Sequence, residues 1–373
     1  MTRPMRVALP DVISPMSRSW QKLPWYGRWI VYVIAIALAA VVLPSSAIGS
    51  FMSPLSDWPT VLFFPVGVYI LLGLGLNVVV GQAGLLDLGY VAFFAIGGYA
   101  MGLLGTNFGW DFWEILPTGI AMSALAGIIL GTPVLRLRGD YLAIVTLGFG
   151  EIVRIAANNF NFTGGPRGVA NIPHPPSVSG VPALTYGILD AKPYYYLVLA
   201  FIVIAIIVVK RLERSRVGRA WVAIREDEDA AEMMGVPTLK FKLAAFAIGA
   251  SIGGAGGVIW ASETIFINPD NFQFTLSTLI LAAVVLGGSG NVPGVILGAF
   301  LVAWLPERFR GFADYRVLVF GGALVLMMIL RPEGLLPSRR RRAEMESGGD
   351  GASGGKLGAE VGGEEPAVVE AAE

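Results

Sequence analysis

The residues of this chain that could do chemistry are few, and they lie inside or beside long apolar runs. Glu151 and Arg154 are three positions apart, so one face of a helix can hold them as an ion pair. An ionisable group at membrane depth is by default a candidate for a functional site, with a self-satisfied structural pair as the equal alternative. Extending this reasoning to nearby polar side chains, the candidates for a translocation path are Asn77, Gln82, Asp87, Thr146 and Glu151.

Groups that would support catalysis are missing from the sequence. The chain has no cysteine and one histidine, His174, which argues against a thiol nucleophile and against a multi-histidine metal site. The nearest approach to a P-loop, GASGGKL in the tail, has Asp350 in place of the first glycine and Leu357 in place of Ser or Thr. We therefore expect no enzymatic activity, no metal and no cofactor in this chain.

The composition predicts a polytopic membrane protein. Of the 373 residues, 55% are hydrophobic, and the mean hydropathy is +0.67. Ten apolar runs predict an all-α fold with about ten transmembrane helices: 29–43, 61–80, 90–104, 115–135, 141–157, 194–209, 243–261, 274–286, 295–305 and 317–330. A full crossing takes about 20 residues, so several of these helices are expected to be short or broken.

One strongly charged segment, residues 210–242, separates two of these runs. We name it the charged segment; it has eight basic and six acidic side chains in a chain that is only 14% charged overall. A bilayer core would not accept it, so it is expected in water or against another protein. An apolar stripe crosses it at helical spacing and consists of Val217, Trp221, Ile224, Ala231 and Met234. The pattern favours a docking element, and a solvated linker is the alternative.

Helix-ending signals divide the charged segment into two short helices. Asp227 can cap the second helix, Gly235 suits the position just after it, and Pro237 prevents continuation.

The distribution of lysine and arginine predicts the orientation. With ten crossings and a cytoplasmic N-terminus, 21 of the 27 basic residues lie inside, five lie outside, and Arg154 lies in a membrane segment. The positive-inside rule therefore favours cytoplasmic termini and a cytoplasmic charged segment. The predicted organisation is an N-terminal arm at 1–28, a transmembrane domain at 29–337 and a disordered, low-complexity tail at 338–373.

Two apolar runs are interrupted by glycine and polar residues, at GQAGLLDLG (81–89) and LGGSGNVPG (286–294). Irregular backbone at membrane depth is tolerated only inside protein or beside a water-filled path, and paired interruptions point to a transport route. The alternative is that both are short cytoplasmic turns.

Small residues recur every fourth position in several runs. Such faces let membrane helices approach closely, so we expect them to pack helices rather than to contact substrate. The predicted packing positions are Gly98, Gly102, Gly249, Gly253, Gly257, Gly290, Gly294 and Gly298.

Six motifs of this chain are distinctive when they are taken together. They are GLNVVVGQAGLLDLGYVAFFAIGGYAMGLL (75–104), LRLRGDYLAIVTLGFGEIVRI (135–155), the TGGPRG loop, GRAWVAIREDEDAAEMMGV, VVLGGSGNVPGVILGA and LRPEGLLP. Together they resemble the membrane permease subunits of branched-chain amino acid ABC importers. The resemblance covers residues 61–337. It implies two inverted halves, a homologous second permease, two cytoplasmic ATPases that bind ATP, and a periplasmic amino-acid-binding protein at the bacterial inner membrane.

The resemblance also extends to the charged segment. Asp229, Ala230, Ala231 and Gly235 resemble the E-A-A-x-x-x-G element through which ABC importer permeases engage their ATPase, with aspartate in place of glutamate. The implied function is inward transport of branched-chain amino acids. Permeation of urea, short amides or other amino acids, and an ion-coupled secondary transporter acting alone, are the alternatives.

Overall fold

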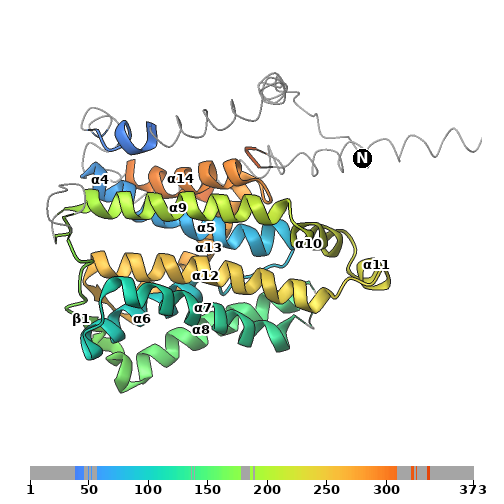
Figure 1. Ribbon diagram of the computed structural model, residues 1–373, viewed down its shortest axis with the longest axis horizontal. Coiled ribbons are helices and arrows are strands. Elements are labelled where there is room, and N and C mark those ends of the chain that lie inside the picture. Colours follow the sequence, from blue (N-terminus) through green and yellow to red (C-terminus); the bar gives the residue numbers. More distant parts are fainter. Residues whose placement is uncertain are drawn as a thin grey trace, which may run out of the picture. The chain divides into compact units, whose positions relative to one another are not determined.

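The structure is a computed structural model (Figure 1). It describes residues 38–45, 49, 52, 57–135, 137, 139–177, 185–187, 190–308, 321, 322, 325 and 334–336. The expected N-terminal arm 1–28, the tail 338–373 and most of the apolar runs 29–43 and 317–330 lie outside these residues.

The chain divides into two units, Met1–Pro59 and Thr60–Glu373. In the first unit, residues 38–41 are helical, and the indole Nε1 of Trp58 donates to the carbonyl oxygen of Leu43 at 2.6 Å.

The described part of the chain is predominantly helical, as expected. The elements are α4 (Trp58–Val61), the π-helical η1 (Leu62–Gly67), α5 (Val68–Leu76), the π-helical η2 (Asn77–Gln82), α6 (Val91–Phe108), α7 (Phe112–Val134) and α8 (Asp140–Asn159). Two short 3₁₀ turns, η3 (Asn161–Thr163) and η4 (Gly165–Arg167), precede the strand β1 (Val169–Ala170). Then follow α9 (Ala191–Glu213), α10 (Arg216–Glu226), α11 (Glu228–Met233), α12 (Thr238–Thr264), β2 (Phe266–Ile267), η6 (Pro269–Phe272), α13 (Phe274–Gly287) and α14 (Val292–Arg308).

Seven helical segments of the described chain are long and apolar enough to cross a membrane. They are Trp58–Gln82, Val91–Phe108, Phe112–Val134, Tyr141–Asn159, Ala191–Glu213, Thr238–Thr264 and Pro269–Gly287. The ninth predicted run, 295–305, forms α14, which is 17 residues long. A multi-pass helical membrane protein is thereby confirmed.

The first long segment is not a continuous α-helix. Phe64 has extended backbone angles (φ −134°, ψ 126°) just before Pro65, which has no amide hydrogen to donate within a helix. The last six residues of the segment Trp58–Gln82 form the π-helical η2. The expectation that some helices are short or broken therefore holds for this segment.

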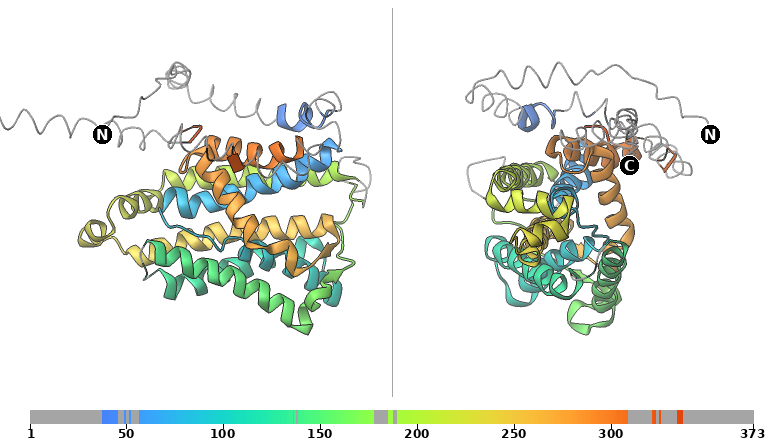
Figure 2. Two further views of the ribbon diagram at one scale, coloured as in Figure 1. Left: turned by 180° about the vertical axis from the view of Figure 1, so that it is seen from behind. Right: turned by 90° about the vertical axis from the view of Figure 1, so that its right-hand side faces the viewer.

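Helix α12 lies at the centre of the second unit and packs against α5, α6 and α7. Figure 2 shows α6, α7 and α8 on one side of α12, with α5, α9 and α14 on the other. Helices α10 and α11 project from one end of the bundle, and the antiparallel pair β1–β2, with Val169 opposite Ile267, lies at the other end (Figure 1).

Candidate functional site

The two interrupted runs of the sequence are true interruptions of helix in the structure. After η2 the chain leaves helical geometry at Gly84, which has φ +73°, and helix resumes only at α6. After α13 the chain turns through Gly288 (φ +107°) and Gly290 (φ +84°) before α14 begins. These positive φ values favour glycine, because a Cβ would clash with the backbone.

The two interruptions meet at one place, which we name the break junction: residues 77–84 and 287–291. The amide of Gly290 donates to Asn77 Oδ1 at 2.8 Å across 213 positions of sequence. A Cβ added to Gly81 would lie 2.5 Å from the backbone nitrogen of Gly290, so the two backbones are in direct contact. Gln82 Nε2 donates to Glu213 Oε1, at the end of α9, at 3.2 Å.

Asp87 and Thr146 form a second polar group next to the junction. Asp87 is 1% exposed, and its Oδ1 accepts from the amide of Gly89 at 2.9 Å. The amide of Leu88 donates to Thr146 Oγ1 at 3.0 Å, which ties the segment between α6 and η2 to α8. Burial raises the pKa of the Asp87 carboxyl to about 7, against the lowering effect of the Gly89 amide.

Unsatisfied polar atoms gather along this first interruption. Asn77 Nδ2, Gln82 Oε1 and Asp87 Oδ2 are buried and have no hydrogen-bond partner within the described part of the chain. Buried polar atoms are nearly always paired. These three atoms therefore leave donor and acceptor capacity for water or for a polar ligand.

Glu151 takes a different position from the other translocation-path candidates. Its Oε2 lies 2.9 Å from Nε of Arg154, and Nη1 of Arg154 lies 3.9 Å from Oδ1 of Asp270 in η6. The structure thus contains the predicted ion pair and adds a third member to it. It places Asn77 and Gln82 on the same element, η2, and Asp87 close to Thr146, whereas Glu151 pairs with Arg154 inside α8, and Arg154 is the residue that reaches η6.

The charged segment folds into the two short helices expected from its end signals. The side chain of Ser215 accepts from the amide of Val217 at 3.1 Å and so caps α10. Asp227 Oδ1 accepts from the amide of Ala230 at 3.0 Å and caps α11. Gly235, with φ +81°, lies just beyond the end of α11. The Asp227 cap and the position of Gly235 confirm the predicted boundaries of the second short helix, whereas the Ser215 cap was not predicted.

Most of the apolar stripe of the charged segment is buried within this chain, so the stripe itself is not an exposed surface, and its coupling to an ATPase stays a prediction. Trp221 is 0% exposed and donates through Nε1 to the carbonyl oxygen of Phe241 in α12 at 2.7 Å. Ile224 and Ala231 are also buried inside this chain, and Val217 is half-buried. Only Met234 of the stripe is exposed, at 84%. Packing of the stripe against α12 removes its apolar area from water, as docking to a partner protein would. The spacing of the apolar residues is the same in both cases, so the sequence pattern cannot distinguish them.

The exposed surface of the charged segment lies instead at the tip of α11. Asp229, Ala230 and Gly235 are exposed there, and Met233 is 87% exposed beside Met234.

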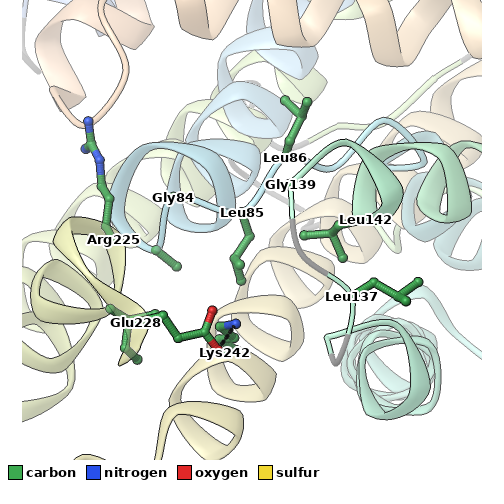
Figure 3. Close-up of a pocket in the computed structure, with 11 residues that line it drawn as sticks. Gly84, Leu85, Leu86, Leu137, Gly139, Leu142, Arg225, Glu228 and Lys242 are labelled. Carbon is green, nitrogen blue, oxygen red and sulfur yellow. Dashed lines mark ion pairs between the residues drawn. The ribbon is translucent and has the colours of Figure 1, made fainter. Parts of the chain in front are cut away.

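A cavity of about 240 Å³ lies between the charged segment and the first interruption. It is lined by residues 83–86, by Leu137, Gly139 and Leu142, and by Ile224, Arg225, Glu228 and Lys242. Lys242 Nζ lies 2.5 Å from Glu228 Oε1, and the lysine side chain is only 3% exposed. Figure 3 shows this pair below Leu85, with the guanidinium of Arg225 directed away from it.

The predicted packing glycines lie where neighbouring elements of the structure approach each other closely. A Cβ on Gly257 would lie 2.7 Å from the backbone nitrogen of Gly98, at the crossing of α12 and α6. A Cβ on Gly249 would lie 2.7 Å from Val79. The remaining positions also face neighbours that a Cβ would crowd: Gly102 at Ile267, Gly253 at Tyr90, Gly290 at Gly81, Gly294 at Gly287 and Gly298 at Ala283.

Four charged residues at this site were not singled out by sequence reasoning: Glu213, Arg225, Glu228 and Lys242. Each lies in the charged segment, where a solvated role is the ordinary expectation. The sequence contains only a weak signal for these four residues. They are charged side chains next to an apolar stripe or near the end of a membrane helix, where a buried contact is possible.

Comparison with known proteins gives a consistent result. The family described as the permease component of branched-chain amino acid transport systems matches residues 60–330. The high-affinity branched-chain amino acid transport system permease protein LivM of Escherichia coli (strain K12) is 47% identical over 299 residues, 75% of this chain and 70% of the relative. The probable branched-chain amino acid transport permease protein LivM of Methanocaldococcus jannaschii is 25% identical over 324 residues, 73% of this chain and 91% of the relative.

A shorter match connects this chain to a second kind of permease. The high-affinity branched-chain amino acid transport system permease protein LivH of Escherichia coli (strain K12) is 30% identical over 124 residues, 33% of this chain and 40% of the relative. No solved structure matches significantly. The family match covers most of the chain, including both helix interruptions and the charged segment, and this chain therefore belongs to the family of permease components of branched-chain amino acid transport systems.

Proposed function

We propose that this chain is one permease subunit of an ATP-driven importer that carries branched-chain amino acids into the cytoplasm. The observation that carries the proposal is the family match over residues 60–330, with 47% identity to a high-affinity branched-chain amino acid permease. The family is one of transport permeases and not of enzymes. ATP binding and hydrolysis are therefore assigned to separate partner subunits.

The proposed assembly contains a second, homologous permease, two cytoplasmic ATPases and a periplasmic amino-acid-binding protein. The partial similarity to LivH supports the second permease. The exposed tip of α11, with Asp229, Ala230, Met233 and Met234, is the proposed contact for an ATPase. Trp221, Ile224 and Ala231 would support that tip from inside the chain.

Ten crossings in two inverted halves, with cytoplasmic termini in the inner membrane, complete the proposal. The seven long segments and α14 account for eight crossings. The apolar runs 29–43 and 317–330 supply the other two. An apolar cargo needs no charged cage, which agrees with the few ionisable groups in the membrane runs, and Asn77, Gln82, Asp87 and Thr146 are the proposed polar groups of the path.

Reconstitution of the complete complex in liposomes tests this function. Uptake of labelled leucine, isoleucine or valine is expected only with ATP on the ATPase side and with the binding protein on the other. Uptake by this chain alone under a proton or sodium gradient would instead favour a secondary transporter. ATPase stimulation by urea or short amides, but not by leucine, would change the assigned cargo.

A further inference from the structure

Three segments distant in sequence converge on the break junction, and a single arginine joins the charged segment to it. Arg225, at the end of α10, donates from Nη1 to the carbonyl oxygen of Gly81 at 2.5 Å. The same nitrogen lies 3.4 Å from the place that a Cβ of Gly290 would occupy. The guanidinium therefore lies against both interruptions at once.

Close backbone approach makes this contact possible. Gly81 contacts the backbone of Gly290, and Gly290 in turn donates to Asn77. Gly84 lies so near Arg225 that a Cβ there would be 2.7 Å from Cγ of the arginine. Glycines at these positions thus let the arginine stem and the second interruption pack directly on the first.

The carbonyl that Arg225 contacts is well suited to a cation. Gly81 lies in the last turn of η2, where carbonyl groups lack partners in the helix and the helix dipole is negative. A hydrogen bond from a charged donor is roughly twice as strong as a neutral one. The contact therefore resists separation when α10 moves.

Arg225 is also firmly connected to the body of α10. It follows Trp221 by four positions, one helical turn, and Trp221 is buried and bonded to Phe241 of α12. A displacement of α10 consequently carries the buried indole and the guanidinium together.

We propose that Arg225 is a positioning residue that transmits movement of α10 to the break junction, so that both helix interruptions rearrange together. The inference rests on the proposed function, because it requires an ATPase that moves the charged segment. Within that function it identifies the contact through which the movement reaches the transport route. Gln82, bonded to Glu213 at the end of α9, supplies a second and weaker connection on the same side.

The test uses the complete complex in liposomes and compares Arg225→Met, Arg225→Lys and a matched control, Arg219→Met. Arg219 lies on the same helix and is exposed, and its side chain donates only to the nearby carbonyl of Arg214, at 3.3 Å, among the contacts of the described chain. For Arg225→Met we expect leucine uptake per ATP hydrolysed to fall about tenfold, the factor expected when one charge-assisted hydrogen bond is lost. Arg225→Lys should recover part of that ratio, and Arg219→Met should leave it unchanged.

Amide hydrogen exchange gives a readout that a merely structural role would not change. In the wild-type complex, nucleotide binding should alter exchange in both parts of the break junction, residues 77–84 and 287–291, together. In Arg225→Met the response of α10 and α11 should persist, while the response of both interruptions should be lost.

The outcomes separate this inference from the proposed function. A wild-type complex without ATP-driven uptake would contradict the function itself. An active wild type, with an unchanged uptake ratio and exchange response in Arg225→Met, would overturn only the role of Arg225. Failure of Arg225→Met to assemble while Arg219→Met assembles would also overturn it, by making Arg225 an assembly residue.

Discussion

At the scale of single residues, the pair formed by Lys242 and Glu228 is the most enclosed ion pair of the described chain. The lysine lies in the first turns of α12, and the glutamate begins α11, so the pair connects the tip of the charged segment to the central helix. An ammonium group that is 3% exposed needs its partner, because an unpaired buried charge is costly.

We predict that Glu228→Gln destabilises the chain by about 3–5 kcal/mol, the range seen when one partner of a buried ion pair is removed. The double variant Glu228→Gln with Lys242→Met should recover most of this loss, because no buried charge remains. Thermal unfolding of the purified chain in detergent measures both effects. Glu226→Gln, at an exposed position two residues away, is the control. Equal stability of the two single variants would contradict the prediction.

At the scale of elements, the contact between α6 and α12 depends on backbone meeting backbone. A Cβ on Gly257 would approach the carbonyl oxygen of Phe94 and lie 2.7 Å from the backbone nitrogen of Gly98, and neither can rotate away. A Cβ added to the adjacent Gly256 would have Cδ2 of Leu72 as its nearest neighbour, 3.3 Å away, and that atom belongs to a flexible side chain.

The two neighbouring glycines are therefore expected to respond differently to alanine. Gly257→Ala should cost about 1–3 kcal/mol of unfolding free energy through overpacking, which exceeds the gain in helix propensity. Gly256→Ala should be neutral within about 1 kcal/mol, because Leu72 can adjust while the helix gains propensity. Thermal unfolding of both variants under the same conditions measures the two effects. A loss of stability in Gly256→Ala as large as that in Gly257→Ala would refute the backbone explanation.

At the scale of the whole molecule, the two ends of the second unit carry different segments. The charged segment projects from one end, and the loop with the TGGPRG motif and the β1–β2 pair lies at the other (Figure 1). Because the natural chain has no cysteine, single cysteines can report which end faces which side of the membrane.

Labelling with a membrane-impermeant maleimide should distinguish Asn161→Cys from Met234→Cys. Both positions are exposed: Asn161 begins η3, shortly before β1, and Met234 caps the end of α11. The labelled elements β1 and α11 lie toward opposite ends of the bundle (Figure 1). In intact spheroplasts we expect labelling at 161 only, with labelling at 234 appearing once the membrane is permeabilised. The cysteine-free parent is the blank. Labelling of 234 from outside would reverse the proposed orientation and remove the ATPase contact from the cytoplasm.

Much of the fold could be read from the sequence because the bilayer imposes length and apolarity on every crossing. Eight of the ten predicted runs are helices in the described chain, and Ser215, Asp227 and Gly235 contribute local signals that mark the ends of α10 and α11. Such features depend on neighbours a few positions away, which the sequence contains.

Only the tertiary structure decided which partner each of those surfaces meets. The period of the stripe is the same whether Trp221 faces α12 or another protein, and nothing near Asn77 in sequence indicates Gly290, 213 positions away. The contact of Arg225 with Gly81 likewise arises from the packing of α10 on the break junction. Local patterns determine helices and their ends, whereas contacts between distant segments depend on the energy of the whole packed arrangement.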